Sequence, residues 1–405
     1  MRAAVVGGGL AGVAAALDLA DAGHEVTLLE ARPTLGGKVQ TLPAREGDPE
    51  PPPDNGQHIA LGCFDAYLRF LARIGSANSV RRLPLELTIV DERGRGASIR
   101  YGVASLLGYA HVSLRDRIQI ASMLARLPRL EPRDESFAAF LRRHGQSQAA
   151  LGRFWEVFVR PAVNLRLDEA DARVARFTIV RALRSGRSSS DLVLPARPLG
   201  EMHGEAATAA LVRAGVRVET STRIDELDAV DADAVVLAVP PEEAGRLLRE
   251  EWAYEHSPIV SVHLLFDRRL LRRPLAALLG SHAHWIFDRG RLTGHEPERG
   301  QYLTVVSSGV PELLEIRGRE LVDLIAREVT ERLGAGELLW SRVSREPEAT
   351  VAVRPPVRRP ALRHGRVAVA GAWTMPPWPP TMESAVRSGR AAARMLSEVA
   401  TKVAV

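Results

Sequence analysis

The sequence predicts an α/β protein in which a nucleotide-binding domain is interrupted twice by a second, α+β domain. Three observations support this class. A glycine-rich turn between an apolar strand and a helix opens the chain, similar apolar strands return near residues 216, 235 and 368, and different strand and helix patterns fill the stretches between them. We therefore assign residues 1–80, 200–254 and 351–405 to the nucleotide-binding domain, and residues 81–199 and 255–350 to a discontinuous substrate-binding domain.

The first thirty residues predict a Rossmann-like unit. Residues 3–6 have the apolar character of a buried parallel strand, residues 11–22 predict a helix, and residues 25–29 predict a second strand. A Gly-x-Gly-x-x-Gly segment joins the first strand to the helix and contains Gly7, Gly9, Leu10, Ala11 and Gly12. Such glycines allow a tight turn, a close backbone approach to a pyrophosphate, and close packing of the helix on the strand.

Glu30 supports the dinucleotide interpretation of this unit. It ends the second strand, 18 residues after Gly12, where a carboxylate can accept hydrogen bonds from ribose hydroxyls. The alternative is a secretory signal, since Met1 and Arg2 precede an apolar and glycine-rich run. A signal peptide has no use for Glu30, so we prefer the dinucleotide site. This unit alone does not distinguish NAD from FAD.

The residues that follow favour FAD. The segment Arg32-Pro-Thr-Leu-Gly-Gly-Lys38 resembles the second glycine signature of the amine-oxidase and carotenoid-desaturase group of flavoproteins. The resemblance implies an amine-oxidase-like fold with FAD contacts from Ala31, Arg32, Gly37 and Lys38. Lys38 stands where arginine is usual in that group, which keeps the charge but loses the planar fork of a guanidinium.

The C-terminus carries a second part of the same resemblance. A buried strand over residues 367–370 is followed by Gly371, Ala372, a proline cluster, and a helix expected from residue 382 to about 399. The resemblance implies that Gly371, Ala372, Met382, Glu383 and Ala385 lie at the flavin, and that the backbone of Ile224 contacts the adenine. The group has aspartate where Ala372 stands, and losing that hydrogen bond costs about 1–3 kcal/mol.

Narrower motifs point to one family within the group. The segments Asp54-Asn55-Gly56-Gln57-His58, Phe154-Trp155-Glu156, Pro161-Ala-Val-Asn164, Leu194-Pro195 and His284-Trp285-Ile-Phe-Asp-Arg-Gly290 occur in the order found in the hydroxysqualene dehydroxylase family. This resemblance implies a long-chain isoprenoid substrate and reduction of hydroxysqualene to squalene by reduced FAD, a step of lipid metabolism that feeds hopanoid biosynthesis. It places Asn55, Gly56, Gln57 and His58 at the cofactor.

The same motifs supply candidates for chemistry. His58 is the candidate acid that protonates the departing hydroxyl, because histidine can donate a proton near neutral pH; the alternative is that it only holds Asn55 or the flavin. Trp155, Asn164 and Trp285 are candidates for lining the substrate site, against ordinary core packing. Alternatives for the whole protein are a carotenoid-type desaturase, an amine oxidase, or a non-catalytic scaffold with the flavin fold.

Composition excludes several other classes. The chain of 405 residues has one cysteine, Cys63, so it has no intrachain disulfide framework or cysteine-rich zinc site. Its net charge is +5, but the cations are almost all arginines spread along the chain, so we expect no nucleic acid partner. We also expect no metal, although His282 and His284 alternate on a predicted strand.

One helix face raises the question of membranes. No apolar run is long enough for a membrane span. A single cysteine fits a reducing, cytoplasmic setting, which is where we expect the protein. However, one face of a predicted helix carries Leu114, Ile118, Ala121, Leu124 and Leu127, with arginines elsewhere on the helix. Such a face either packs in the core or attaches the protein peripherally at the inner face of a membrane, where an isoprenoid dissolves. The sequence assigns no electron donor.

Overall fold

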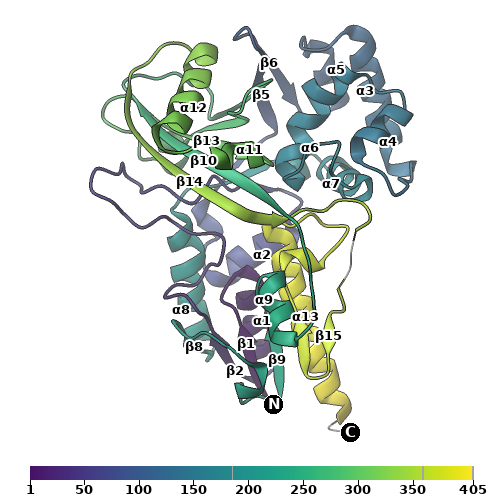
Figure 1. Ribbon diagram of the computed structural model, residues 1–405, viewed down its shortest axis with the longest axis vertical. Helices are drawn as coiled ribbons and strands as arrows, with labels where there is room; N and C mark the ends of the chain where they lie inside the picture. Colours follow the sequence, from purple (N-terminus) through teal and green to yellow (C-terminus); the bar gives the residue numbers. More distant parts are fainter. Residues whose placement is uncertain (185, 358–359, 404–405) are drawn as a thin grey trace.

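Two large β-sheets organise the chain, one in the lower half and one in the upper half of Figure 1. The structure is a computed structural model that describes residues 1–184, 186–357 and 360–403. Both chain termini lie at the lower end, beside the first sheet, and the helices between residues 114 and 184 lie at the opposite end (Figure 1).

The lower sheet has six strands and is mainly parallel. Its order is β15 (Arg363–His364), β16 (Val367–Val369), β9 (Ala234–Leu237), β1 (Arg2–Val6), β2 (Glu25–Leu29) and β8 (Arg217–Glu219), and only the β15–β16 pair is antiparallel. β1 and β9 are almost entirely apolar and buried, as expected of strands covered on both faces. The predicted α/β class is confirmed.

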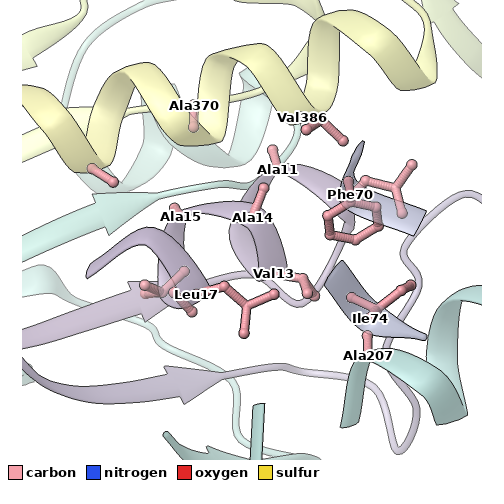
Figure 2. Packing of buried hydrophobic residues seen from close by; sticks show 14 of the residues in the cluster. Ala11, Val13, Ala14, Ala15, Leu17, Phe70, Ile74, Ala207, Ala370 and Val386 are labelled. Atoms are coloured by element: carbon pink, nitrogen blue, oxygen red, sulfur yellow. The ribbon is translucent and has the colours of Figure 1, made fainter. Parts of the chain in front are cut away.

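Helices from both ends of the chain pack together beside this sheet. α1 (Leu10–Asp21) and α13 (Met382–Val403) lie against one another, and Figure 2 shows Ala11 and Val386 facing across their contact. Gly389 makes the approach possible, because a Cβ at this position would lie 1.9 Å from the carbonyl oxygen of Ala11. The other helices near the sheet are α2 (Asp65–Ile74), α8 (Ala206–Arg213) and α9 (Pro241–Leu248).

The upper sheet has seven strands and is mainly antiparallel. Its order is β14 (Leu338–Val351), β10 (His256–Phe266), β13 (Gln301–Ser308), β12 (Trp285–Asp288), β11 (Leu275–Leu278), β5 (Glu86–Val90) and β6 (Gly96–Arg100), with β11 and β5 parallel. A third, small sheet has the order β3 (Ala60–Leu61), β7 (Leu192–Pro195) and β4 (Val80–Leu83). Its strands come from segments that the sequence assigns to both predicted domains. We propose the two large sheets as the centres of the two domains.

Short helices complete the upper half. They are α3 (Leu114–Arg126), α4 (Phe137–Arg143), α5 (Gln148–Ala150), α6 (Glu156–Val163), α7 (Ala172–Arg184), α10 (Arg289–Thr293), α11 (Pro311–Glu315) and α12 (Gly318–Leu333). A π-helical segment, η4 (Leu151–Trp155), joins α5 to α6. Along the described ranges, no helix combines the length and apolar character needed to cross a bilayer.

The predicted elements differ from the observed ones mainly at their ends. The first helix begins at Leu10, one residue before the predicted start, and the strand predicted over residues 234–239 stops at Leu237, before its two prolines. The C-terminal helix continues to Val403, past the predicted end. β14, the longest strand, was not predicted, because its polar and charged residues hide the alternation of an edge strand.

Candidate active site

The glycine turn after β1 is closely fitted to the strands around it. Gly7 has φ of +105°, which favours glycine, and a Cβ on Gly12 would lie 1.8 Å from the carbonyl oxygen of Gly7. The N–H of Gly8 donates to Oε2 of Glu30 at 2.6 Å, and the N–H of Arg32 donates to Oε1 at 2.8 Å. The buried Glu30 carboxylate therefore fixes the turn, and its remaining lone pairs can still accept bonds.

The second glycine pair packs directly on the first. The N–H of Gly36 donates to the carbonyl of Gly8 at 2.9 Å, and a Cβ on Gly37 would lie 2.9 Å from Cα of Gly9. Arg32 donates through Nη1 to the carbonyl of Gly37. The two glycine signatures thus form one interlocked structure, which explains why both require residues without side chains.

The N-terminus of α1 lacks a protein cap. Gly9 is its N-cap residue, no side chain caps it, and the first turn contains no acidic residue. The positive end of the helix dipole and the N–H groups of the first turn, contributed by Leu10, Ala11 and Gly12, suit a phosphate.

A buried ion pair joins Asp54, directly before the Asn-Gly-Gln-His segment, to Arg289, the first residue of α10. Nη1 of Arg289 donates to Oδ2 of Asp54 at 2.7 Å, and each side chain is only 2% exposed. Oδ1 of Asp54 accepts bonds from Oγ1 of Thr41 and the N–H of Leu199, and Nη2 of Arg289 donates to the carbonyl of Pro52. Two motifs 235 residues apart are therefore held in contact through fully paired carboxylate oxygens.

The next residues combine satisfied and unsatisfied polar groups. Nδ2 of Asn55 donates to the carbonyl of Lys38 at 2.7 Å, which ties this segment to the second glycine pair. Within the described part of the chain, the buried atoms Nδ1 of His58 and Nε2 of Gln40 have no hydrogen-bond partner. Unpaired buried polar atoms are costly, so each of these two atoms is available for a hydrogen bond with a polar group of a bound ligand.

Burial lowers the pKa of His58, with the nearby Asp54 opposing the shift. At neutral pH its imidazole is therefore neutral. A neutral imidazole can donate one hydrogen bond and accept one, but only the protonated imidazolium can act as a general acid near neutral pH. The lowered pKa thus favours the alternative to the predicted acid, in which His58 holds a neighbouring group.

Two other buried histidines beside this segment give a pH prediction. Burial lowers the pKa of His203 and of His263 to about 3 in each case, while the unfolded side chains keep the ordinary value of about 6.5. Both folded pKa values are depressed, so their contribution to stability is complete above about pH 6.5 and is lost as pH falls. At pH 5 each should cost about 2 kcal/mol.

Urea unfolding at pH 7 and pH 5 measures this loss. Burial raises the pKa of Asp171 and Asp288, which opposes the trend, so the informative quantity is the difference between wild type and His263→Gln. The variant should lose about 2 kcal/mol less than wild type between the two pH values. An identical pH dependence in both proteins would show that His263 is not held neutral.

The C-terminal residues face the same region. Ala372 begins a short turn, η8 (Ala372–Thr374), after β16, and the N–H of Gly371 donates to Oγ of Ser388. Glu383 is fully buried and does not cap its own helix. Its carboxylate accepts from the N–H groups of Ala66 and Tyr67 at 3.2 and 2.7 Å, and from Nε of Arg387 at 2.7 Å.

Two further predicted cofactor residues, Lys38 and Ile224, also have protein partners. Nζ of Lys38 donates to the carbonyl of Glu348 on β14, and the carbonyl of Ile224 accepts from Nη2 of Arg246 at 3.0 Å. Ile224 nevertheless follows a segment bonded to the end of β2, since the N–H of Thr222 donates to the carbonyl of Glu30. It therefore lies on the side of the sheet where an adenosine would follow Glu30.

An apolar cavity of about 540 Å³ extends from this region into the upper half of the molecule. At one end it is lined by Ile59, next to His58, and by Pro379 and Thr381, which precede α13. Its walls include the aromatic residues Phe64, Phe154, Trp155, Phe158 and Trp285, and its other end reaches residues 99–106. Its size and lining suit a ligand that is mostly hydrocarbon.

The three predicted substrate residues differ in their placement. Trp155 and Trp285 line the cavity. Asn164 does not: its Nδ2 donates to the carbonyl of Ser257 and to Thr350, and its Oδ1 accepts from the N–H of Gly309. Asn164 ends α6 with φ of +55° and braces the strands behind the cavity, so its assignment to the substrate is corrected.

Comparison with known proteins identifies the family. A family model described as flavin containing amine oxidoreductase matches residues 10–396, almost the whole chain. The chain belongs to this family. As a flavin containing amine oxidoreductase it is an FAD-dependent oxidoreductase, and the cofactor predicted from the glycine signatures is confirmed.

Individual relatives share less than a third of their aligned residues with this chain. The chain is 28% identical to a hydroxysqualene dehydroxylase from Sinorhizobium fredii, over 98% of this chain and 99% of that protein. It is 31% identical to a zeta-carotene desaturase from Synechocystis sp., over only 32% of this chain and 27% of that protein. The solved structure of cyclohexylamine oxidase from Brevibacterium oxydans covers 99% of both chains with a TM-score of 0.73 at 16% identity, which supports the same fold.

The residues of this flavoenzyme fit FAD. The uncapped start of α1 would hold the pyrophosphate and Glu30 the ribose. Gln40, whose Nε2 is unpaired, lies next to Gly36, since a Cβ on Gly36 would be 3.9 Å from Cγ of Gln40. The adenine contact of Ile224 and the contacts of Lys38, Met382 and Ala385 stay predictions. Ala372 offers only a methyl group, so the hydrogen bond that aspartate gives elsewhere in the group is absent at this side chain.

Sequence reasoning missed three residues that shape the site. Asp54 and Arg289 were seen only as parts of motifs, and Gln40 was not considered. A carboxylate and a guanidinium within two separate narrow motifs were the available signal for a pair. The partner of Glu383, the start of α2, had no signal, because capping across 317 residues leaves no local pattern.

Proposed function

We propose that this flavoenzyme reduces hydroxysqualene to squalene. The proposal rests on one observation above all: one apolar, aromatic-walled cavity is lined by Ile59 and Thr381, which are next to the predicted flavin residues His58 and Met382 in the chain, and by many residues of the predicted substrate-binding domain. Full-length similarity to proteins named hydroxysqualene dehydroxylase supports this substrate class.

The reaction replaces one C–O bond with a C–H bond. The hydroxyl leaves as water after taking up a proton, and the carbon receives a hydride, which reduced FAD supplies when bound. Carbon at the reacting centre becomes electron-poor as the hydroxyl departs, and the faces of Phe154, Trp155 and Trp285 can stabilise positive charge. The scarcity of polar wall groups keeps water, a competing nucleophile, away from that carbon.

His58 has an orienting role in this proposal. Its neutral ring, next to the cavity residue Ile59, can hydrogen-bond a hydroxyl or a flavin carbonyl without bringing a charge into the apolar site. Replacing it by asparagine should keep one hydrogen-bonding group and cost less activity than replacing it by leucine.

The test is anaerobic turnover of the purified protein. Flavin reduced chemically and then mixed with hydroxysqualene should be reoxidised, with squalene detected by gas chromatography and mass spectrometry. Parallel assays with oxidised flavin use phytoene-type carotenoids and a primary amine. Reduction of the flavin by a carotenoid would favour the desaturase alternative, and reduction by the amine would favour an amine oxidase.

A scaffold without catalysis is the remaining alternative. It predicts a protein that binds no FAD, or that binds FAD and exchanges electrons with none of these substrates. Absence of squalene in the presence of demonstrably reduced, bound flavin would reject the proposed reaction.

A further inference from the structure

The largest exposed apolar side chains gather at one end of the molecule. Six large hydrophobic residues are strongly exposed in the described chain, and four of them lie between residues 103 and 118. These are Val103, Leu107, Leu114 and Ile118, with exposed fractions of 51%, 67%, 60% and 61%. We call these four residues the apolar rim.

The rim is held in place by its own hydrogen bonds. Val103 and Leu107 lie on a short turn, η2 (Val103–Gly108), and Leu114 and Ile118 lie one turn apart on α3. The side chain of Arg117 joins the two elements, because its Nη1 donates to the carbonyl of Leu107 and its Nε to that of Val112. A capping box between Ser113 and Asp116 fixes the start of α3. The exposure is therefore a property of a structured surface.

The rim borders the far end of the apolar cavity. Val103 itself lines the cavity together with its neighbours Tyr101, Ser105 and Leu106, and Leu124 and Ala125 line it from the far end of α3. The helix face noted in the sequence thus divides along its length: Leu114 and Ile118 are exposed, whereas Leu124 lines the cavity and Leu127 is buried. One end of the face is therefore buried or lines the cavity, and the other end is exposed to solvent.

The charge around the rim is predominantly positive. Residues 100–133 contain six arginines and two acidic residues, and one of the acids, Asp116, is buried. Arg115, Arg126 and Arg129 are exposed on and just after α3. In Figure 1, α3 lies at the end of the molecule away from both termini and from the nucleotide sheet. Apolar side chains flanked by arginines match a bilayer whose headgroups are anionic.

We propose that the apolar rim docks on the surface of an anionic lipid bilayer, so that the cavity receives its isoprenoid directly from the membrane. This rests on the proposed function for the identity of the cargo, but the docking itself does not require it. The attachment is peripheral: the rim inserts a few side chains, and the arginines contact lipid phosphates.

Vesicle binding tests the docking. The FAD-loaded protein is sedimented with vesicles of phosphatidylcholine alone and with vesicles containing phosphatidylglycerol, at low and high salt. Wild type should bind the anionic vesicles, and less at high salt. Leu107→Glu and Ile118→Glu should each reduce the bound fraction about tenfold. The matched control is Val212→Glu on α8, because Val212 is 64% exposed but lies outside the rim, and it should bind as wild type does.

Two further measurements separate the possible failures. In detergent, where the substrate is dispersed, Ile118→Glu should turn over hydroxysqualene at the wild-type rate, whereas with substrate in anionic vesicles it should be slower. If wild type and Ile118→Glu both fail to convert hydroxysqualene in detergent and in vesicles, the proposed function is rejected. The docking would be unaffected by that result. Equal vesicle binding by Ile118→Glu, Val212→Glu and wild type would overturn the docking, as would a wild-type dimer that Ile118→Glu converts to a monomer.

Discussion

Replacing Arg289 by methionine should lower the free energy of unfolding by about 3–5 kcal/mol. Methionine fills part of the volume but removes the partner of a carboxylate that is 2% exposed. Asp54 would keep the bonds from Thr41 and Leu199 to Oδ1, while Oδ2 would be left buried without its cation. The loss should therefore greatly exceed the cost of the missing contacts over Tyr302. Urea unfolding at pH 7 measures it.

The control for this prediction is an ion pair at the surface. Arg319 and Asp323 are 83% and 56% exposed, so Arg319→Met should cost no more than about 0.5 kcal/mol. The double variant Asp54→Asn/Arg289→Met removes both charges and should recover part of the stability, which also provides a folded sample if the single variant does not fold. A loss below 1 kcal/mol for Arg289→Met would contradict the assignment of a desolvated, mutually dependent pair.

The effect of the Asp54–Arg289 pair on function follows from its position in the fold. Asp54 precedes Asn55 and His58, and its own carbonyl accepts a bond from His263, so this ion pair sets where the segment lies beside the second glycine pair. In the folded double variant we expect weaker FAD binding as well as lower stability. Two distant motifs are thus one structural unit, although neither shows this alone.

The sequence was sufficient where the physical cause is local. The turn of Gly7 to Gly12, the strands on either side and Glu30 follow from spacing, and each lies where it was predicted. The same holds for the helix that begins at Met382. What could not be predicted depends on pairing between distant segments: the Asp54–Arg289 pair, the capping of α2 by Glu383, and the inward bonding of Asn164.

Residue chemistry leaves alternatives open where burial decides. His58 was a reasonable acid on its ordinary pKa, but burial favours its neutral form. The face on α3 could not be assigned to core or membrane from its period, because one end meets the cavity and the other meets solvent. How deeply a residue is buried depends on the whole fold. The helical spacing of apolar residues therefore does not predict which of them are buried.

Substituting Gly12 by alanine should abolish retention of FAD during purification. The added Cβ would lie 1.8 Å from the carbonyl oxygen of Gly7 and 3.3 Å from Cβ of Ala238. The first of these neighbours is backbone and cannot rotate away, so the start of α1 must move from the turn whose N–H groups would hold the pyrophosphate. Overpacking of this kind costs about 1–3 kcal/mol or more, equivalent to roughly 10–100-fold weaker FAD binding.

Gly389→Ala approaches the same helix from the other end of the chain. Its Cβ would lie 1.9 Å from the carbonyl oxygen of Ala11, so α13 and α1 must separate (Figure 2). Gly152→Ala is the matched control, because a Cβ there meets nothing within 4 Å. Visible flavin absorbance, FAD titration and thermal unfolding distinguish lost affinity from lost folding. Because the two clashes fall on adjacent residues of α1, both variants should show the same loss of FAD. Normal FAD affinity in either variant would mean that this helix end does not hold the cofactor.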